Sequence, residues 1–162
     1  MNANAFRYLY DYHFSENRKI WDSYIISLSY ERFTQSVSYS HGSVRNQIVH
    51  VMNTDDAWFI GLRGVEFTEP FEPSNFDDRR NIRAHWDEVE HNMREYLGKL
   101  QDDMLLKKPF AEGEDKDLIL WQVLLHVVNH ATDHRAQTLR LLNDLGVNTG
   151  PQDFVFYAYD HP

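Results

Sequence analysis

The sequence contains no cysteine among its 162 residues. A chain without thiols forms no disulfide, no thiolate zinc site and no iron–sulfur cluster, and it has no cysteine nucleophile. Any bound metal ion must therefore take nitrogen or oxygen ligands. Glycine and proline are also scarce, at seven and five residues. Because these two residues interrupt regular structure, their scarcity favours long continuous elements.

Long hydrophobic runs and excess positive charge are lacking as well. No apolar stretch approaches the ~18 residues that span a bilayer, and the N-terminus has no basic start followed by an apolar run. We therefore expect a cytoplasmic protein with no membrane partner. The 16 Lys and Arg residues stand against 25 Asp and Glu residues, which gives a formal net charge of −9. Because such a chain repels phosphate backbones, we expect no nucleic-acid partner.

Apolar and aromatic side chains are abundant, at 42% and 14% of the residues. These shares are typical of a globular protein rather than a disordered one. The length fits a single domain with a sizeable core, since most domains have roughly 100 to 200 residues. We expect residues 1–162 to form that one domain.

Four segments show the three- and four-residue spacing of apolar side chains that is typical of amphipathic helices. They cover about Ala5–Leu28, Val44–Leu62, Asp77–Leu100 and Leu118–Leu145. Ser43 and Asp117 stand where N-caps belong, and Gly146 stands where a left-handed C-terminal residue belongs. Residues 105–117 suit a short hairpin or loop. The sequence therefore predicts an all-α four-helix bundle, against which the aromatic tail, residues 147–162, packs.

The last of these segments carries three histidines four residues apart, His126, His130 and His134. At about 100° per residue, His130 and His134 fall within the apolar arc centred on Val127, and His126 falls at its edge. Imidazoles at positions i and i+4 can converge on one divalent ion. Buried imidazoles that only hydrogen-bond to neighbouring groups would show the same pattern. The spacing alone leaves both interpretations open.

A third ligand would have to come from another segment. His50 lies in the middle of the second segment, but about 160° from the apolar stripe that includes Ile48 and Phe59. The face around His50 carries small or neutral residues, which would let another helix approach closely: Gln47, Thr54, Ala57 and Gly61. Periodicity alone neither selects nor excludes His50.

These motifs resemble the DinB/YfiT-like superfamily of small metal-binding four-helix bundles, and the resemblance covers nearly the whole chain. It is carried by GSVRNQIVHV with Asp55 and Trp58 after it, by LLHVVNHATDHRAQ, and by the Pro151-Gln152-Asp153-Phe154 ending. In that family a histidine of the second helix and an HxxxH pair bind one divalent ion. The resemblance therefore implies His50, His130 and His134 as metal ligands.

Two stretches depart from the family pattern. Asp133 and Ala136 stand where many members have His and Gly. Ser15 and Glu16 replace the Trp and Ala of a motif in the first helix. Neither departure removes a ligand, and the second affects the substrate side of the pocket.

Three histidine ligands leave coordination positions open, as in catalytic zinc sites. The resemblance implies a metal-dependent hydrolase, or a transferase that uses a low-molecular-weight thiol, acting on a small electrophilic molecule. Zinc and nickel suit imidazole ligands. The alternative is a stress or binding protein in which the ion has only a stabilising role. A plain bundle without stoichiometric metal is a third interpretation.

No catalytic residue can be assigned from the sequence. Asp55 lies about 140° from His50 around the helix, which favours a structural role for this carboxylate. Arg135 could steer an anionic thiol or carboxylate, or form an ion pair between helices. We also expect a homodimer, because members of the resembled family often pair and two-fold dimers are the commonest soluble oligomers.

Overall fold

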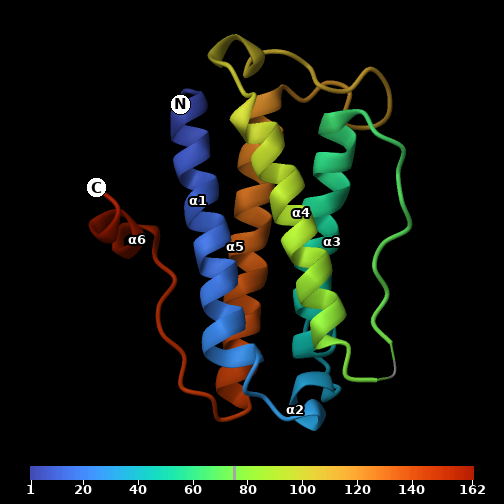
Figure 1. Cartoon of the computed structure of the whole chain (residues 1–162), viewed down its shortest axis with the longest axis vertical. Coiled ribbons are helices and arrows are strands. Elements are labelled where there is room, and N and C mark those ends of the chain that lie inside the picture. The colour runs from blue at the N-terminus through green and yellow to red at the C-terminus, as the bar shows by residue number, and fades with distance from the viewer. Residues whose placement is uncertain (75) are drawn as a thin grey trace.

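The computed structural model describes residues 1–74 and 76–162, and over these residues the fold is all-α. The elements, in chain order, are α1 (Ala3–Ile20), the π-helical turn η1 (Trp21–Ile25), α2 (Tyr30–Thr34), α3 (Val44–Arg63), α4 (Arg79–Gly98), the 3₁₀ turn η2 (Asp102–Met104), α5 (Leu120–Asp144) and α6 (Phe154–Asp160). Figure 1 shows the four long helices, α1, α3, α4 and α5, lying side by side.

Each long helix contacts two others most extensively, in the cyclic order α1, α5, α3, α4. Helices α3 and α4 run in the same direction, so the connection between them passes back along the length of the molecule (Figure 1). The pair that matters most for the site is α3 and α5, which have the most extensive contact of all. No helix within the described residues has the length and hydrophobicity needed to cross a membrane.

Capping residues mark the start and end of α3 and the end of α5. Ser43 is the N-cap of α3, and its hydroxyl oxygen accepts a hydrogen bond from the backbone amide of Asn46 at 3.0 Å. At the other end of α3, Gly64 adopts φ +63°. Gly146, after α5, adopts φ +81°. Both glycines are in the left-handed region that favours glycine. The Ser43 hydrogen bond confirms the predicted N-cap, and the conformation of Gly146 confirms the predicted end of the last helix.

The predicted start of the last helix is wrong. The N-cap of α5 is Ile119 rather than Asp117, and its backbone amide donates to the Gln122 side chain at 3.0 Å. Asp117 instead pairs with Lys108 at 2.6 Å. Because Gln122 already satisfies a backbone donor at this end, the helix does not need the Asp117 carboxylate as a cap.

The first helix and the 105–117 segment also differ from expectation. Helix α1 ends at Ile20 and continues only as the π-turn η1 to Ile25, so Leu28 lies outside it. The carbonyl of Leu28 accepts a hydrogen bond from Arg79 Nη1 at 2.7 Å, which holds the chain in its turn toward α2. Residues 105–117 contain turns and no strand, which excludes the hairpin and confirms the loop.

The aromatic tail packs back on α1 as predicted. Phe154 meets the Tyr12 ring edge-on with centroids 5.2 Å apart, and Tyr157 meets Tyr8 at 5.6 Å. No residue of α6 is fully buried. The tail therefore covers part of α1 without joining the main core.

The core lies between the four long helices and is mostly apolar, with a minority of buried polar side chains. Its most completely buried members include Phe6, Met52, Ile82, Leu124 and Val127, each with 0% of its surface exposed. These side chains come from all four long helices. The four helices therefore share one core, which fixes the positions of α3 and α5 relative to each other.

We predict that Leu124→Ala lowers the free energy of unfolding by about 2–5 kcal/mol, because truncating a fully buried leucine loses transfer energy and leaves a cavity. Urea denaturation followed by circular dichroism measures the change. The control is Leu106→Ala, since Leu106 is 74% exposed. Equal effects of the two substitutions would contradict this assignment of the core.

Candidate metal centre

Histidines from α3 and α5 face each other where these two helices meet. His50 Nε2 lies 3.1 Å from His130 Nε2. The ring of His134 lies 4.5 Å from that of His50 and 4.3 Å from that of His130, centroid to centroid. The structure thus brings together all three residues that the sequence analysis named as metal ligands.

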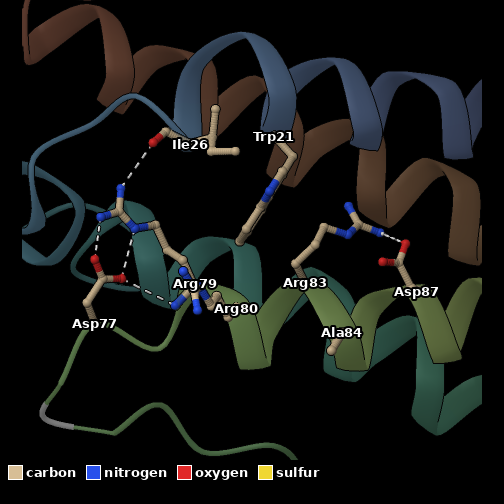
Figure 2. A pocket seen from close by; sticks show the side chains of 8 residues that line it. All are labelled: Trp21, Ile26, Asp77, Arg79, Arg80, Arg83, Ala84 and Asp87. Atoms are coloured by element: carbon tan, nitrogen blue, oxygen red, sulfur yellow. Dashed lines mark hydrogen bonds and ion pairs between the residues drawn. The ribbon is translucent and has the colours of Figure 1, made fainter.

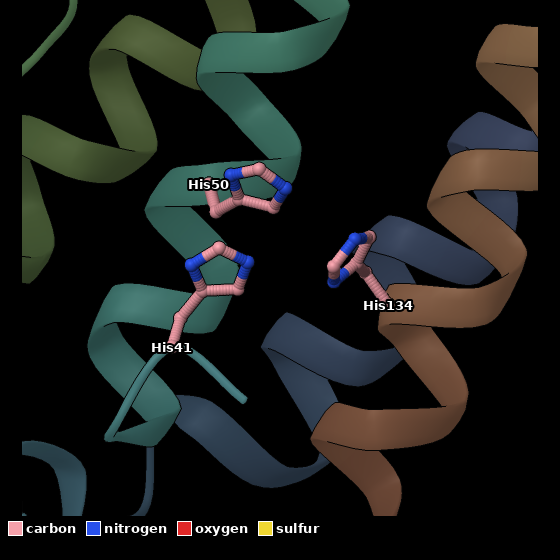
Figure 3. A group of neighbouring side chains, drawn as sticks. All are labelled: His41, His50 and His134. Carbon is pink, nitrogen blue, oxygen red and sulfur yellow. The ribbon is translucent and has the colours of Figure 1, made fainter. Parts of the chain in front are cut away.

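A fourth histidine, His41, joins the cluster from the loop before α3. Its ring stacks on His50 with centroids 3.8 Å apart and planes 21° apart. His41, His50 and His134 each offer a ring nitrogen, and these three nitrogens lie within 4.8 Å of one another, so they could hold a metal ion. Figure 3 shows His41 and His50 on one side of the gap and His134 of α5 on the other.

His41 was not among the ligands expected from the sequence, because it lies in the loop between the first and second predicted helices. Ser40 has φ +48° and Gly42 has φ +84°, so the chain makes a tight reversal just before Ser43. The Ser40 hydroxyl also hydrogen-bonds to Gln47 and Gln137, which ties the loop to α3 and α5. A histidine between two turn-forming residues, next to an N-cap, was the available signal.

The third histidine of the spaced series, His126, lies outside the cluster. It is exposed and packs against Trp58 at a centroid distance of 5.2 Å. Its ring centroid is 5.9 Å from that of His130. This agrees with its expected position at the edge of the apolar arc.

One ring nitrogen of the cluster has a hydrogen-bond partner in Gln47, and another, on His130, has none. His134 Nδ1 lies 2.8 Å from the amide nitrogen of Gln47, a buried residue of α3. His130 Nδ1 is buried and has no hydrogen-bond partner in the described part of the chain. A shared cation is one way to satisfy two imidazole nitrogens as close as those of His50 and His130. The residues present therefore fit a divalent ion.

The electrostatic environment keeps these rings neutral. Burial, reinforced by the neighbouring histidines, lowers the pKa of His50 to about 4. Burial, followed by the charge of His134, lowers the pKa of His130 to about 4, against an opposing effect of Asp55. Burial and His41 also lower the pKa of His134. Because a neutral imidazole is the form that ligates metal, the cluster is in its ligating form near neutral pH.

A buried polar chain lies beside the cluster and links three helices. Arg135 of α5 donates from Nη1 to His13 Nδ1 of α1 at 3.1 Å, and His13 Nε2 lies 3.0 Å from Asp55 Oδ2 of α3. Asn17 contacts two members of this chain, through its amide nitrogen to His13 Nε2 and through its carbonyl oxygen, which accepts from Arg135 Nη1. All four side chains are at most 4% exposed.

These buried hydrogen bonds show whether Asp55 and Arg135 are bonded within the protein or are free to act on a substrate. Asp55 is buried and bonded within the protein, as a structural carboxylate would be. Arg135 is only 2% exposed, and its other donors bond to Gln152 and Thr132. Burial lowers the pKa of Arg135. Its guanidinium is therefore a bonded core group rather than one that steers a substrate from solvent.

A different hollow, about 690 Å³, lies between η1 and α4 (Figure 2). Three arginines line it, which would suit an anion, but Arg79 bonds to Asp77 and Arg83 pairs with Asp87 at 2.7 Å. Those two carboxylates offset two of the three positive charges. None of its lining residues belongs to α3 or α5, so it is separate from the histidine cluster.

Comparison with known proteins agrees with this geometry. The model of the DinB family matches residues 1–161. The chain belongs to the DinB family. It is also similar to "Protein DinB" of Bacillus subtilis (strain 168), with 24% identity over 168 residues that cover 98% of this chain and 96% of that protein.

The positions at which this sequence departs from the DinB-family pattern lie outside the histidine cluster. Asp133 is exposed and accepts a hydrogen bond from Gln137 at 2.9 Å, so it points away from the histidine cluster. Glu16, at a variant position of the first helix, pairs with Lys19. Neither side chain replaces a histidine of the cluster.

We predict that the metal-free protein loses stability as the pH falls from about 6.5 to about 4. The folded-state pKa values of His50 and His130 lie below the ordinary value of 6.5, so in this range the unfolded chain binds more protons than the folded one. The contribution of these histidines is complete above pH 6.5 and decreases below it. Urea unfolding at pH 7, 5.5 and 4.5 measures this slope.

His50→Gln and His130→Gln should each make that slope shallower. His91→Gln is the control, because His91 is an exposed residue of α4. If both cluster variants keep the parental pH dependence, the neutral rings are not what sets it.

Proposed function

We propose that this DinB-family protein is a four-helix-bundle metalloprotein whose His50, His130 and His134 bind one divalent ion. The observation that carries the proposal is the convergence of imidazoles with lowered pKa values from α3 and α5, with their nitrogens as close as 3.1 Å. The unpartnered, buried Nδ1 of His130 supports it further. Zinc and nickel are among the first-row ions that suit an all-imidazole ligand set, and we propose one of these two.

The reaction that we propose is hydrolysis, or transfer of a low-molecular-weight thiol, on a small electrophilic substrate. A divalent ion bound by three imidazoles lowers the pKa of a coordinated water or thiol. The chain supplies a place for the substrate, because a cavity of about 420 Å³ lies along α3 and is walled by Trp58 and Phe110. Thr54, which also lines it, is four residues and therefore one helical turn from His50.

The alternative is a non-catalytic protein in which the ion ties α3 to α5. The position of His41 favours it, since a ring nitrogen of His41 lies within 4.8 Å of those of His50 and His134 and could add a further protein ligand, as closed structural zinc sites have. His41 is exposed and lies on a loop, whereas the other three histidines lie on long helices. We therefore favour the interpretation in which the substrate, rather than His41, takes the fourth coordination position of the ion.

We further propose that the protein is a homodimer. Helix α6 leaves several large apolar side chains exposed: Phe154, Val155, Phe156 and Tyr159. Exposed apolar side chains that cluster in this way are characteristic of association surfaces.

We expect about one zinc or nickel ion per chain in untagged protein, measured by elemental mass spectrometry. His50→Ala, His130→Ala and His134→Ala should each lose most of it, because two remaining imidazoles hold an ion far less tightly than three. His126→Ala is the matched control on the same helix as His130, and should keep the ion. Circular dichroism confirms that each variant is folded.

No stoichiometric ion, even after incubation with zinc or nickel, would refute the proposal and leave a bundle with hydrogen-bonded core histidines. Equal loss of metal in His126→Ala would instead indicate that the ion binds nearer to His126 on α5.

We expect the metal-loaded protein to consume a small electrophile, with either water or a low-molecular-weight thiol as the second reactant. Chromatography of the products distinguishes hydrolysis from thiol transfer. His130→Ala should abolish turnover, whereas His41→Ala should keep it because the three helical histidines remain. Stoichiometric metal without turnover in both the parent and His41→Ala would favour the non-catalytic alternative.

A further inference from the structure

The loop that carries His41 is held in place by bonds of its own backbone. The Gly42 amide donates to the Tyr39 carbonyl at 3.0 Å, and the Gly42 carbonyl accepts from the Val37 amide at 2.7 Å. The His41 carbonyl accepts a hydrogen bond from the side chain of Asn46 at 3.1 Å. None of these bonds uses the ring of His41, so they fix the loop whatever that ring binds.

The ring of His41 contacts two of the histidines that the proposed function assigns to the ion. It stacks on His50 with centroids 3.8 Å apart, and its centroid lies 5.3 Å from that of His134. One nitrogen of each of these three rings lies within 4.8 Å of the other two, across the gap that Figure 3 shows. An ion that these nitrogens share is therefore within reach of His41.

His41 differs from the other clustered histidines in how freely its ring can move. It is exposed and lies on a loop, whereas the three ligands of the proposed function are partly buried and lie on long helices. Exposed side chains change rotamer rapidly by rotation about their own bonds. The ring of His41 can therefore turn away from the cluster while the backbone of its loop stays in place.

We propose that His41 is a fourth, displaceable ligand of the ion, an inference that rests on the proposed function. Before a substrate binds, His41 occupies the coordination position that the three helical histidines leave open. A substrate or thiol then takes this position, and the His41 ring turns out to solvent. Four protein ligands close a zinc site, whereas three leave room for a reactant. The same site thus has a closed form that retains the ion and an open form that binds the reactant.

One equilibrium sets two measurable quantities. A His41 ring that is bound in about 90% of the metal-loaded chains strengthens metal binding about tenfold, and it weakens the binding of a competitor for the same position by the same factor. Because this contribution is modest, the three helical histidines still supply most of the metal affinity.

The first test measures both quantities in the parent and in His41→Gln, a substitution that leaves no cavity because His41 is exposed. Zinc affinity, from competition with a chelator, should be about tenfold weaker in His41→Gln. The Co²⁺-loaded variant should bind 2-mercaptoethanol about tenfold more tightly than the Co²⁺-loaded parent, as followed by the thiolate-to-cobalt charge-transfer band. His126→Gln is the matched control, because His126 is an exposed histidine outside the cluster, and it should match the parent in both affinities.

Unchanged zinc and thiol affinities in His41→Gln would overturn the inference while leaving the proposed function intact. Weaker zinc binding without tighter thiol binding would also overturn it, because the thiol would then not compete with His41. A parent that binds no zinc would overturn both the inference and the proposed function.

The second test needs no substitution and therefore does not depend on the folding of His41→Gln. Nitrogen-15 NMR of the histidine-labelled, zinc-loaded parent should show a zinc-bound ring nitrogen on His41 as well as on the three helical histidines. Saturation with 2-mercaptoethanol should return His41 alone to the spectrum of a free ring. A His41 ring that is free before the thiol is added, or that stays zinc-bound at saturation, would overturn the inference.

Discussion

The burial of one positive charge constrains the rest of this structure. Arg135 is only 2% exposed, and an arginine taken out of water is tolerated only when its donors are bonded and its charge is compensated. Its partners come from α1, from α5 and from the tail, and the chain through His13 reaches the Asp55 carboxylate on α3. Breaking one member would leave the others buried without partners. The three helices are therefore held in one relative position, the position in which His50 meets His130.

Much of the fold follows from local chemistry that is visible in the sequence. Ser43 acts through its own hydroxyl and Gly146 through its own backbone conformation, so their roles as N-cap and helix terminator could be predicted. The boundaries that failed depend on distant or competing groups. Beyond the end of α1, the carbonyl of Leu28 is bonded to Arg79 of α4. The N-cap of α5 is Ile119 rather than Asp117, and the Ile119 amide is bonded to Gln122. Neither interaction is visible from the periodicity of a single segment.

The histidines of the cluster also fall into those whose position could be predicted from their own helix and those whose position depends on other segments. His130 and His134 could be assigned to an inward face, because the apolar pattern of their own helix defines it. The face of His50 is defined by the approach of α5, which its own helix does not encode, and only the family resemblance indicated it. His41 depends on a loop reversal between Ser40 and Gly42. Asp55 did give a signal, since a carboxylate on the stripe of Ile48 and Phe59 is a group that folding buries.

The parallel course of α3 and α4 has a consequence for how the protein reaches its native state. Adjacent parallel helices need a long return connection, and α3 has its most extensive contact with α5 rather than with α4, the next long helix in the chain. His50 and His130 are 80 residues apart in the chain. Contacts between such distant residues close a large loop and form slowly. In the unfolded chain only His130 and His134 are close in sequence, so the proposed ligand set would form only after α3 has docked against α5. Ion binding would then draw the equilibrium toward the folded state by mass action.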